Sequence, residues 1–304
     1  MITRVFFALA PLIIASVAVA QTAVIPAGSA SSTANSQVVR FRQTPVAVGD
    51  QVTQTLNVDL GLTTKITQSG QTAHESSNRM RREQQRKIEV LEIVDGRATK
   101  AKAEFIVSRR QTPESSKPEE LVTQPIEGKS YLMSRDGDRI VVTSLDGENP
   151  PEEEARLVAE SLENVGKPNP FATLLVDRPM AVGQRVLVPR DVVQSLLGFE
   201  GPIGSVHRFE LTLLRVEPQT SARSSPVGVF QATIEVKPND ESPLSITLTG
   251  EMSVETETCR LSEVNMVGPV QLSSIERTAG GIFQFSAGGE LNLAIRSDYA
   301  KQVR

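Results

Sequence analysis

Hydrophobic and polar residues alternate along most of the chain after residue 40. In the segment Val52–Leu62, apolar positions alternate with Thr, Asn and Asp, which is the pattern of a strand with one buried and one hydrated face. Asp95-Gly96 and Asp136-Gly137-Asp138 each separate two such segments and predict hairpin turns, because these residues tolerate positive φ angles. The other expected strands are Lys87–Val94, Ala98–Ser108, Ser130–Arg135, Arg139–Leu145, Val206–Val216, Val227–Val236, Leu244–Val254, Thr258–Val267 and Ile282–Ile295.

One helix is well marked between Asn149 and Gly166. Two prolines open it, and the acidic run Glu152–Glu154 suits the positive end of the helix dipole. A shorter helix is expected at Arg190–Leu197, before Gly198. Together the elements predict a mainly β fold of the α+β type, with two related, largely antiparallel curved sheets that each carry about one packed helix. The apolar stripe of the first helix is Leu157, Val158, Ser161, Leu162 and Val165.

A short pattern, P-x-A-V-G-x-x-V, occurs twice, at Pro45–Val52 and at Pro179–Val186. Both copies precede a β-rich block with a wide hairpin, which favours an internal duplication. The shared glycine permits a tight turn where the chain enters its first strand. We therefore expect a first β-rich half at 40–167 and a second at 168–304, with the boundary in the segment KPNP. Two such copies could join their edges into one continuous curved sheet.

The first twenty residues have the three parts of a secretory signal peptide. A charged start is followed by the apolar run Val5–Val17 and by Ala18-Val19-Ala20, so cleavage is expected between Ala20 and Gln21. The apolar run is too short for a convincing membrane anchor, and we expect no transmembrane helix after cleavage. Residues 21–39 contain mainly Ala, Ser, Thr and Gln without charge and predict a flexible leader. The protein is thus expected to be exported and soluble, either periplasmic or secreted.

Composition narrows the function classes. The full chain of 304 residues has a formal net charge of −4, which does not favour a nucleic-acid partner. It contains no tryptophan and two tyrosines, so Val, Leu, Ile and Phe must form the cores. Cys259 is the single cysteine and rules out an internal disulfide. We expect Cys259 to be a half-buried structural residue in a strand, with an intermolecular disulfide as the alternative.

Patterns for catalysis and metal binding are weak. The two histidines are His74, in a polar segment expected to be a solvated loop, and His207, which opens a strand. Neither has a second ligand at metal-binding spacing, so no metal site and no cofactor are expected. Ser205 lies two residues before His207, but this spacing on a strand is not a catalytic triad. The Asp136 turn lacks the repeating oxygen ligands of a calcium loop. The protein is therefore expected not to be an enzyme.

A basic run at the start of one expected strand is the densest cluster of charge. Such a cluster could contact acidic polymers or phosphates. The cluster lacks aromatic residues that could stack on a ligand. The alternative interpretation is that these basic residues are the solvated part of a strand or of a hairpin tip. The residues of this candidate anionic-ligand patch are Arg79, Arg81, Arg82, Arg86 and Lys87.

The second half carries the segments RPMAVGQRVLVP, DVVQSLLGFEG, ITLTGEMSVETETCRLSEVNM and GGIFQFSAGGELNLAI. Over about residues 171–296 it resembles a family of exported bacterial proteins, of planctomycete type, that have no assigned activity. The chain departs from this family at Val186, where a Trp is usual, and at Glu255–Cys259, where a more acidic, glycine-bearing turn is usual. The resemblance implies an exported, β-rich fold and no mechanism.

Two functions are compatible with this sequence. The first is a non-catalytic structural or interaction module that binds an envelope protein or a cell-wall component through its sheet edges. The alternative is a carrier that encloses an apolar, lipid-like ligand in a half-barrel cavity between sheet and helix, an idea that comes from fold analogy. An interaction module should expose an apolar patch or a long unpaired edge strand. A carrier should contain an apolar, solvent-connected cavity of several hundred Å³ under its helix.

Overall fold

The computed structural model of the chain describes residues 38–111, 120–137, 139–189, 192, 205–220, 225–239, 243–278 and 281–300. Within these residues strands dominate, and every strand pair of the main sheet is antiparallel. The expected mainly β fold is confirmed. The expected signal peptide with its Ala20–Gln21 cleavage site, and residues 21–37 of the expected leader, lie outside the described residues. No helix in the described ranges is long and apolar enough to cross a membrane.

The first half forms a meander of antiparallel strands, as its alternating pattern predicts. The turn at Asp95-Gly96 has φ angles of 51° and 74°, which confirms a hairpin with two residues in the left-handed region. The turn at Asp136-Gly137 joins two more strands, and Asp138 lies outside the described residues. The strands are β2 (Gln51–Gln68), β3 (Gln71–Val94), β4 (Arg97–Arg110), β5 (Val122–Thr123), β6 (Ser130–Asp136) and β7 (Arg139–Ser144).

The second half is also a meander of antiparallel strands. Each strand expected after residue 205 is present, and the last two extend well beyond their expected ends. The strands are β9 (Arg185–Leu187), β10 (Ser205–Glu217), β11 (Val227–Lys237), β12 (Leu244–Glu255), β13 (Leu261–Thr278) and β14 (Gly281–Ala300).

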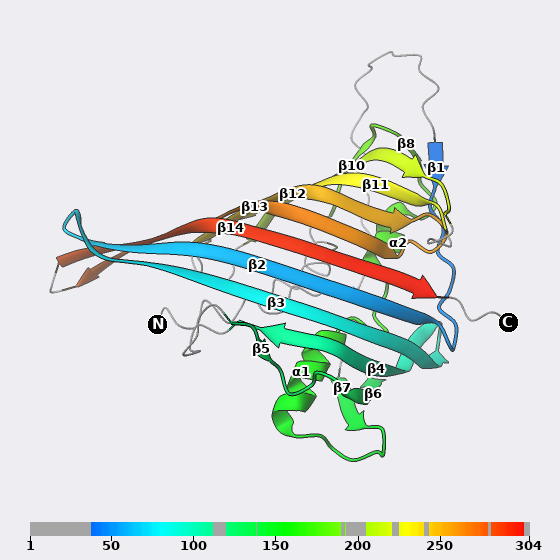
Figure 1. Cartoon of the computed structure of the whole chain (residues 1–304). Helices are drawn as coiled ribbons and strands as arrows, with labels where there is room; N and C mark the ends of the chain where they lie inside the picture. The colour runs from blue at the N-terminus through cyan, green and yellow to red at the C-terminus, as the bar shows by residue number, and fades with distance from the viewer. Residues whose placement is uncertain are drawn as a thin grey trace, which may run out of the picture.

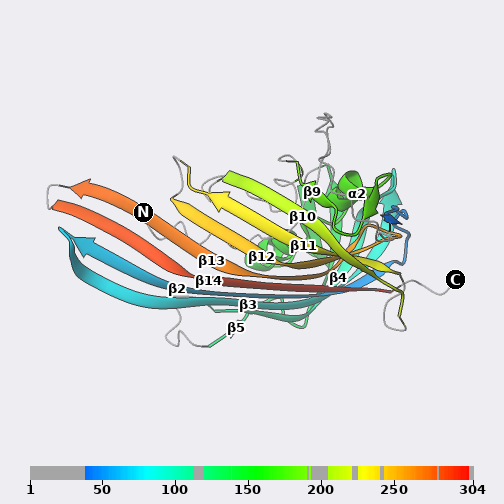
Figure 2. The ribbon, with the colours of Figure 1, turned by 90° about the horizontal axis from the view of Figure 1, so that it is seen from above.

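The two halves are joined edge to edge into one curved sheet (Figures 1 and 2). The last strand, β14, pairs with the first long strand, β2, from Phe283 opposite Gln68 to Ala300 opposite Gln51. The sheet order is β7-β6-β4-β3-β2-β14-β13-β12-β11-β10-β9, and β5 pairs with β4. The expected curved sheets are therefore one continuous sheet of twelve strands in the described residues. Its two outer strands, β7 and β9, are short.

A separate two-stranded sheet ties the N-terminal segment to the second half. Strand β1 (Val38–Arg40) pairs with β8 (Pro179–Ala181), so structure begins inside the segment expected to be leader. The next residue, Phe41, is buried against Phe230, with ring centroids 5.7 Å apart. The start of the first half by sequence thus packs into the core of the second half.

Two helices lie on the concave face of the sheet (Figure 2). Helix α1 (Glu152–Leu162) confirms the expected helix and buries four of its five expected stripe residues. Helix α2 (Pro170–Leu175) was not expected; the side chain of Asn169 caps it by accepting a hydrogen bond from the backbone N–H of Phe171 at 3.0 Å. The helix expected at Arg190–Leu197 lies outside the described residues except for Val192.

The buried side chains form two clusters on the concave face. The larger cluster packs α2 against strands of the second half and also includes Leu56 and Leu60 of β2. The smaller cluster packs α1 against β3, β4, β6 and β7, around Phe105 and Tyr131. The two cores therefore meet at β2 and β3, near the centre of the sheet.

The two copies of the P-x-A-V-G pattern fold in the same way. Both Ala47–Asp50 and Ala181–Gln184 are tight turns, with Gly49 and Gly183 at φ angles of 87° and 84°. In each turn the last side chain accepts a hydrogen bond from the first backbone N–H. This local match is consistent with a duplication, which stays a prediction. The matched backbone bonds are Gly49 N to Val90 O, Val90 N to Asp50 O, Gly183 N to Leu213 O and Leu213 N to Gln184 O.

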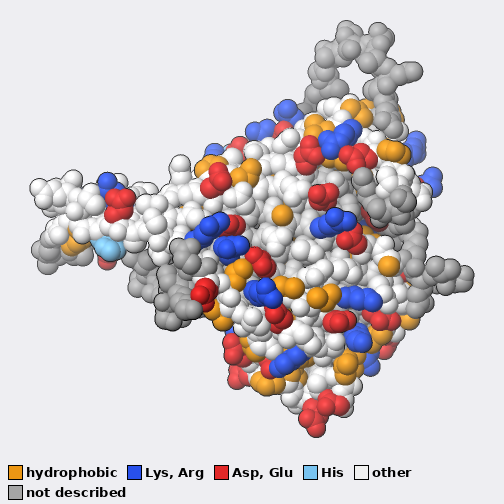
Figure 3. Space-filling view, viewed as in Figure 1, with side chains coloured by type: hydrophobic (Ala, Val, Ile, Leu, Met, Phe, Trp, Pro, Cys, Tyr) orange, Lys and Arg blue, Asp and Glu red, His pale blue; other side chains and the backbone are white. Residues whose placement is uncertain are grey.

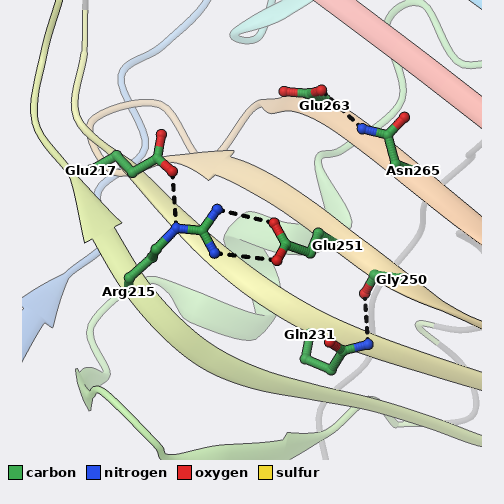
Figure 4. Close-up of polar contacts among 7 residues, drawn as sticks. All are labelled: Arg215, Glu217, Gln231, Gly250, Glu251, Glu263 and Asn265. Atoms are coloured by element: carbon green, nitrogen blue, oxygen red, sulfur yellow. Dashed lines mark hydrogen bonds and ion pairs between the residues drawn. The ribbon is translucent and has the colours of Figure 1, made fainter.

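The convex face of the sheet carries acidic and basic side chains interspersed with one another (Figure 3). In the second half Arg215 donates to Glu251 at 3.0 and 3.2 Å and to Glu217 at 3.0 Å (Figure 4). Gln231 donates to the carbonyl oxygen of Gly250 at 3.0 Å. Cross-strand pairs of this kind keep the outer face hydrated, so the concave face holds the apolar residues.

Candidate functional site

A cavity of about 330 Å³ lies between the concave face of the sheet and the segment 164–171, which runs from just after α1 into the start of α2. The cavity opens to solvent and is located where the two hydrophobic clusters meet. A cavity of about 150 Å³ is enough to hold benzene, so this space accepts a considerably larger ligand. It is the kind of cavity that the carrier hypothesis requires.

The floor of the cavity is largely apolar because β2, β3 and β14 turn alternate side chains toward the helices. Leu56 and Ile295 come from the larger cluster, and Ile88 and Val52 come from the smaller cluster or its border. The roof includes Phe171. The apolar lining residues are Val46, Val52, Leu56, Ile88, Val90, Ala98, Val165, Pro168, Pro170, Phe171, Leu261 and Ile295, with the ring of Tyr299 beside them.

Gly166 brings the roof of the cavity close to the sheet. Its φ angle is 84°, and a Cβ at this position would collide with the carbonyl oxygen of Ala98 in β4. Arg135 of β6 fixes the same segment by donating from Nε to the carbonyl oxygen of Val165 at 2.8 Å. The backbone of the roof is thus fixed over the cavity by its contacts with β4 and β6.

One end of the cavity is polar. Arg86 of β3 is 7% exposed and donates from Nε to Oε1 of Gln54 at 3.1 Å and from Nη1 to the carbonyl oxygen of Ser161. Burial, and then the charge of Arg82, lowers the pKa of Arg86 to about 9, which leaves the guanidinium charged at neutral pH. A charged group therefore stands at the C-terminal end of α1, beside an apolar space.

The basic run predicted as one patch is divided between the two faces of the sheet. Side chains of Arg79, Arg81 and Lys87 occupy the odd positions of β3, and Arg82 and Arg86 occupy the even positions with the buried residues. On the outer face Arg79 donates to Asp59 at 2.8 Å and Arg81 pairs with Glu83 at 3.2 Å. The five residues do not form one anion-binding surface.

Neither histidine forms a site. His74 lies in β3 opposite Ile66 and is exposed; the expectation of a loop was wrong because β2 and β3 continue to a turn at Ser69-Gly70. His207 is exposed in β10, as expected of an ordinary strand residue. The described residues contain no group of three His, Cys, Asp or Glu side chains that could hold a metal ion.

Cys259 does not occupy the half-buried strand position that its sequence predicts. It is fully buried in the turn between β12 and β13, with a φ angle of 53°. Its carbonyl oxygen accepts a hydrogen bond from Nδ2 of Asn169 at 2.8 Å, which ties this turn to the cap of α2. Burial raises the pKa of its thiol to about 12, so the thiolate form is disfavoured at neutral pH.

Sequence reasoning missed most of the cavity. The alternation of β3 would have placed Arg86 on the same face as Ile88 and Val90, and this was an available signal for a buried arginine. Asn164 and Tyr299 also line the cavity, but they come from distant parts of the chain. Their convergence depends on the pairing of β14 with β2, which local sequence patterns do not specify.

Comparisons with known proteins give little further information. No protein-family model and no curated protein matches the chain. A structure on lipid–protein interactions in lipovitellin aligns with a TM-score of 0.33 and 11% identity over 84% of this chain, but the match spans only 26% of the lipovitellin chain. A TodX monoaromatic hydrocarbon channel mutant (TM-score 0.23, 8% identity) covers 84% of this chain and 91% of its own.

A LolA superfamily protein from Nitrosomonas europaea aligns with a TM-score of 0.14 and 10% identity over 79% of this chain and 85% of its own. Similarities at this level carry no argument about function.

Proposed function

We propose that the protein is an exported, non-catalytic carrier that encloses an apolar ligand in the cavity between its sheet and the segment 164–171. The observation that carries this proposal is the solvent-connected cavity of about 330 Å³ with its largely apolar lining. Binding sites for small molecules are concave, mostly apolar and often located where two cores meet. Export is supported by the signal-like pattern that ends at Ala20.

The polar groups around the cavity suit binding better than catalysis. Tyr299 donates its hydroxyl to the carbonyl oxygen of Leu261 at 3.0 Å, and burial raises its pKa to about 12. Such a group is not a base at neutral pH. Arg260 lies over the Tyr299 ring at 5.2 Å and pairs with Asp50 at 2.9 Å, so it stabilises the wall of the cavity.

An interaction module is the second candidate, and it depends on a different part of the molecule. The ends of four long strands, at 63–78, 273–278 and 281–286, extend away from the two cores (Figure 1), and we call them the wing. Ile275 and Ile282 are 65% and 52% exposed on this wing. The outer strands β7 and β9 are too short to favour edge pairing. Native purification in which a protein, and not a lipid, co-purifies would favour this candidate.

Binding of an uncharged fluorescent probe such as Nile red tests the carrier proposal. Val52 lines the cavity, so Val52→Phe should fill part of the space and weaken probe binding about tenfold or more. The matched control is Val267→Phe, because Val267 is 41% exposed and does not line the cavity. The proposal fails if the wild-type protein does not bind the probe. It also fails if the two variants bind the probe equally well.

A further inference from the structure

The charged residues that line the cavity are not equally compensated. Arg260 pairs with Asp50 at 2.9 Å, and Lys167 pairs with Glu163 at 2.8 Å. Arg86 is the fourth charged lining residue, and no carboxylate of the described residues forms an ion pair with it. An isolated buried charge is costly unless it is paired, so Arg86 needs an explanation.

The contacts of Arg86 use part of its guanidinium. A guanidinium has five N–H donors. Nε and Nη2 each donate to Oε1 of Gln54, and Nη1 donates to the carbonyl oxygen of Ser161. Within the described residues, one N–H of Nη1 and one N–H of Nη2 therefore remain for another acceptor. Guanidinium N–H groups commonly bind the oxygens of a carboxylate or a phosphate.

A second buried polar group without a partner belongs to a residue that lines the same cavity. Both side-chain amide atoms of Asn164 are buried and have no hydrogen-bond partner among the described residues. Asn164 lines the cavity three residues after Ser161, at the end of α1 where Arg86 binds. Buried polar groups in folded proteins are nearly always hydrogen-bonded, so an unsatisfied amide in a cavity wall indicates a missing polar partner.

A structural role explains Arg86 only in part. Its bond to the carbonyl oxygen of Ser161 satisfies the C-terminal end of α1, where a positive charge suits the helix dipole. Arg135 already donates to the carbonyl oxygens of Glu163 and Val165 at this end. Capping of the C-terminal end of α1 uses one N–H of Arg86. It does not explain why the buried amide of Asn164 has no hydrogen-bond partner among the described residues.

We propose that the ligand is a single-chain amphiphile with an anionic oxygen headgroup, which rests on the proposed carrier function. The headgroup accepts hydrogen bonds from Arg86 and from Nδ2 of Asn164. The acyl or alkyl chain lies against the apolar floor formed by Leu56, Ile88 and Ile295. One ligand would thus pair with the charge of Arg86, form a hydrogen bond with the amide of Asn164 and fill the apolar space.

Calorimetric titration of the whole protein with decanoate, decyl phosphate and decanol tests the headgroup, because these probes share one chain length. The wild-type protein should bind at least one of the two anions about tenfold more tightly than decanol, and the tighter anion identifies the headgroup. Arg86→Gln should remove this preference, so that neither anion binds more tightly than decanol. Arg86→Lys should keep part of the preference, because it retains the charge. The control Arg79→Gln removes an equal charge from the outer face and should change nothing.

The outcomes separate the two proposals. Equal binding of decanol and both anions by the wild-type protein overturns the headgroup proposal and leaves the carrier function standing. If the wild-type protein binds none of the three probes, the carrier function itself is overturned. If Arg86→Gln does not fold, Asn164→Leu decides, since its amide has no bond to lose within the described residues. An Asn164→Leu protein with an undiminished preference for anions counts against the proposal.

Discussion

At the scale of single residues, Glu154 shows how an acidic residue of a helix start becomes part of the core. It is 8% exposed, and its carboxylate accepts hydrogen bonds from Nζ of Lys129 at 2.7 Å and from the hydroxyl of Tyr131 at 2.5 Å. The sequence predicted only a favourable interaction with the helix dipole. Glu154 in fact anchors the first turn of α1 to β6, which positions the whole helix over the sheet.

We expect Glu154→Gln to lower the free energy of unfolding by about 1–2 kcal/mol at pH 7. The bond from Lys129, and then the bond from Tyr131, lowers the pKa of Glu154 below its ordinary value. A lowered carboxylate pKa stabilises the fold above the unfolded-state pKa, and this stabilisation is lost as pH falls through the folded-state pKa. Urea unfolding at several pH values should therefore show the difference between wild type and variant shrinking below about pH 4.

The matched control for this experiment is Glu160→Gln. Glu160 lies in the same helix and pairs with Arg156 at 2.8 Å, but its side chain is 44% exposed. Its substitution should cost no more than about 0.5 kcal/mol. A Glu154→Gln penalty that is as large at pH 3 as at pH 7 would show that the carboxylate charge is not what stabilises this contact.

At the scale of elements, two neighbouring glycines of β14 have different roles in the pairing that joins the halves. A Cβ at Gly289 would collide with the backbone of Gly61 in β2 and would lie 3.0 Å from Cα of Leu62. A Cβ at Gly288 would meet nothing within 4 Å. The two strands therefore approach closely at Gly289, and only a residue without a side chain permits this approach.

Gly289→Ala should lower the free energy of unfolding by about 1–3 kcal/mol, because β2 and β14 must move apart to admit the methyl group. Gly288→Ala should be neutral or stabilising by up to about 1 kcal/mol, since it restricts the unfolded chain without a clash. Chemical denaturation of the two variants measures this difference. Equal effects of the two substitutions would contradict the close approach of the strands.

Helices, strands and hairpins could be predicted where a pattern of neighbouring residues indicates them. The hairpin at Asp95-Gly96 and helix α1 follow from turn residues, an acidic first turn and one apolar stripe. Helix α2 has six residues in a Pro-rich segment, which is too short to show a periodic pattern. The outer part of β3 is polar on both faces around His74, so alternation gave no signal there.

At the scale of the whole molecule, the sequence does not predict which distant segments of the chain contact one another. Nothing in the local pattern indicates that Phe41 packs against Phe230, or that β14 returns to β2. The cavity results from these long-range pairings, since they bring Leu56 and Ile295 beneath the segment 164–171. The site was therefore less predictable than the fold: the alternation of β3 indicates the face of Arg86, but only the pairing of β2 with β14 completes the floor of the cavity on that face.

The same pairings predict that the two halves unfold together. Strands β2 and β14 pair over eighteen residue positions, and β1 ties the start of the chain to the second half. Separate unfolding of one half would expose a long edge strand and the floor of the cavity, so we expect one cooperative transition. The chain has no tryptophan, which allows Phe105→Trp and Phe230→Trp to report on the smaller and the larger cluster in turn.

For each of these variants, the midpoint of urea unfolding measured by fluorescence should equal the midpoint measured by circular dichroism. This holds even if the substitution itself lowers the stability of the protein. Both variants should also show the same dependence of the unfolding free energy on urea, because the same surface becomes exposed. Addition of Gly289→Ala weakens the junction of the halves and should lower both midpoints together. A midpoint that moves for one reporter alone would show that the continuous sheet contains two units that unfold independently.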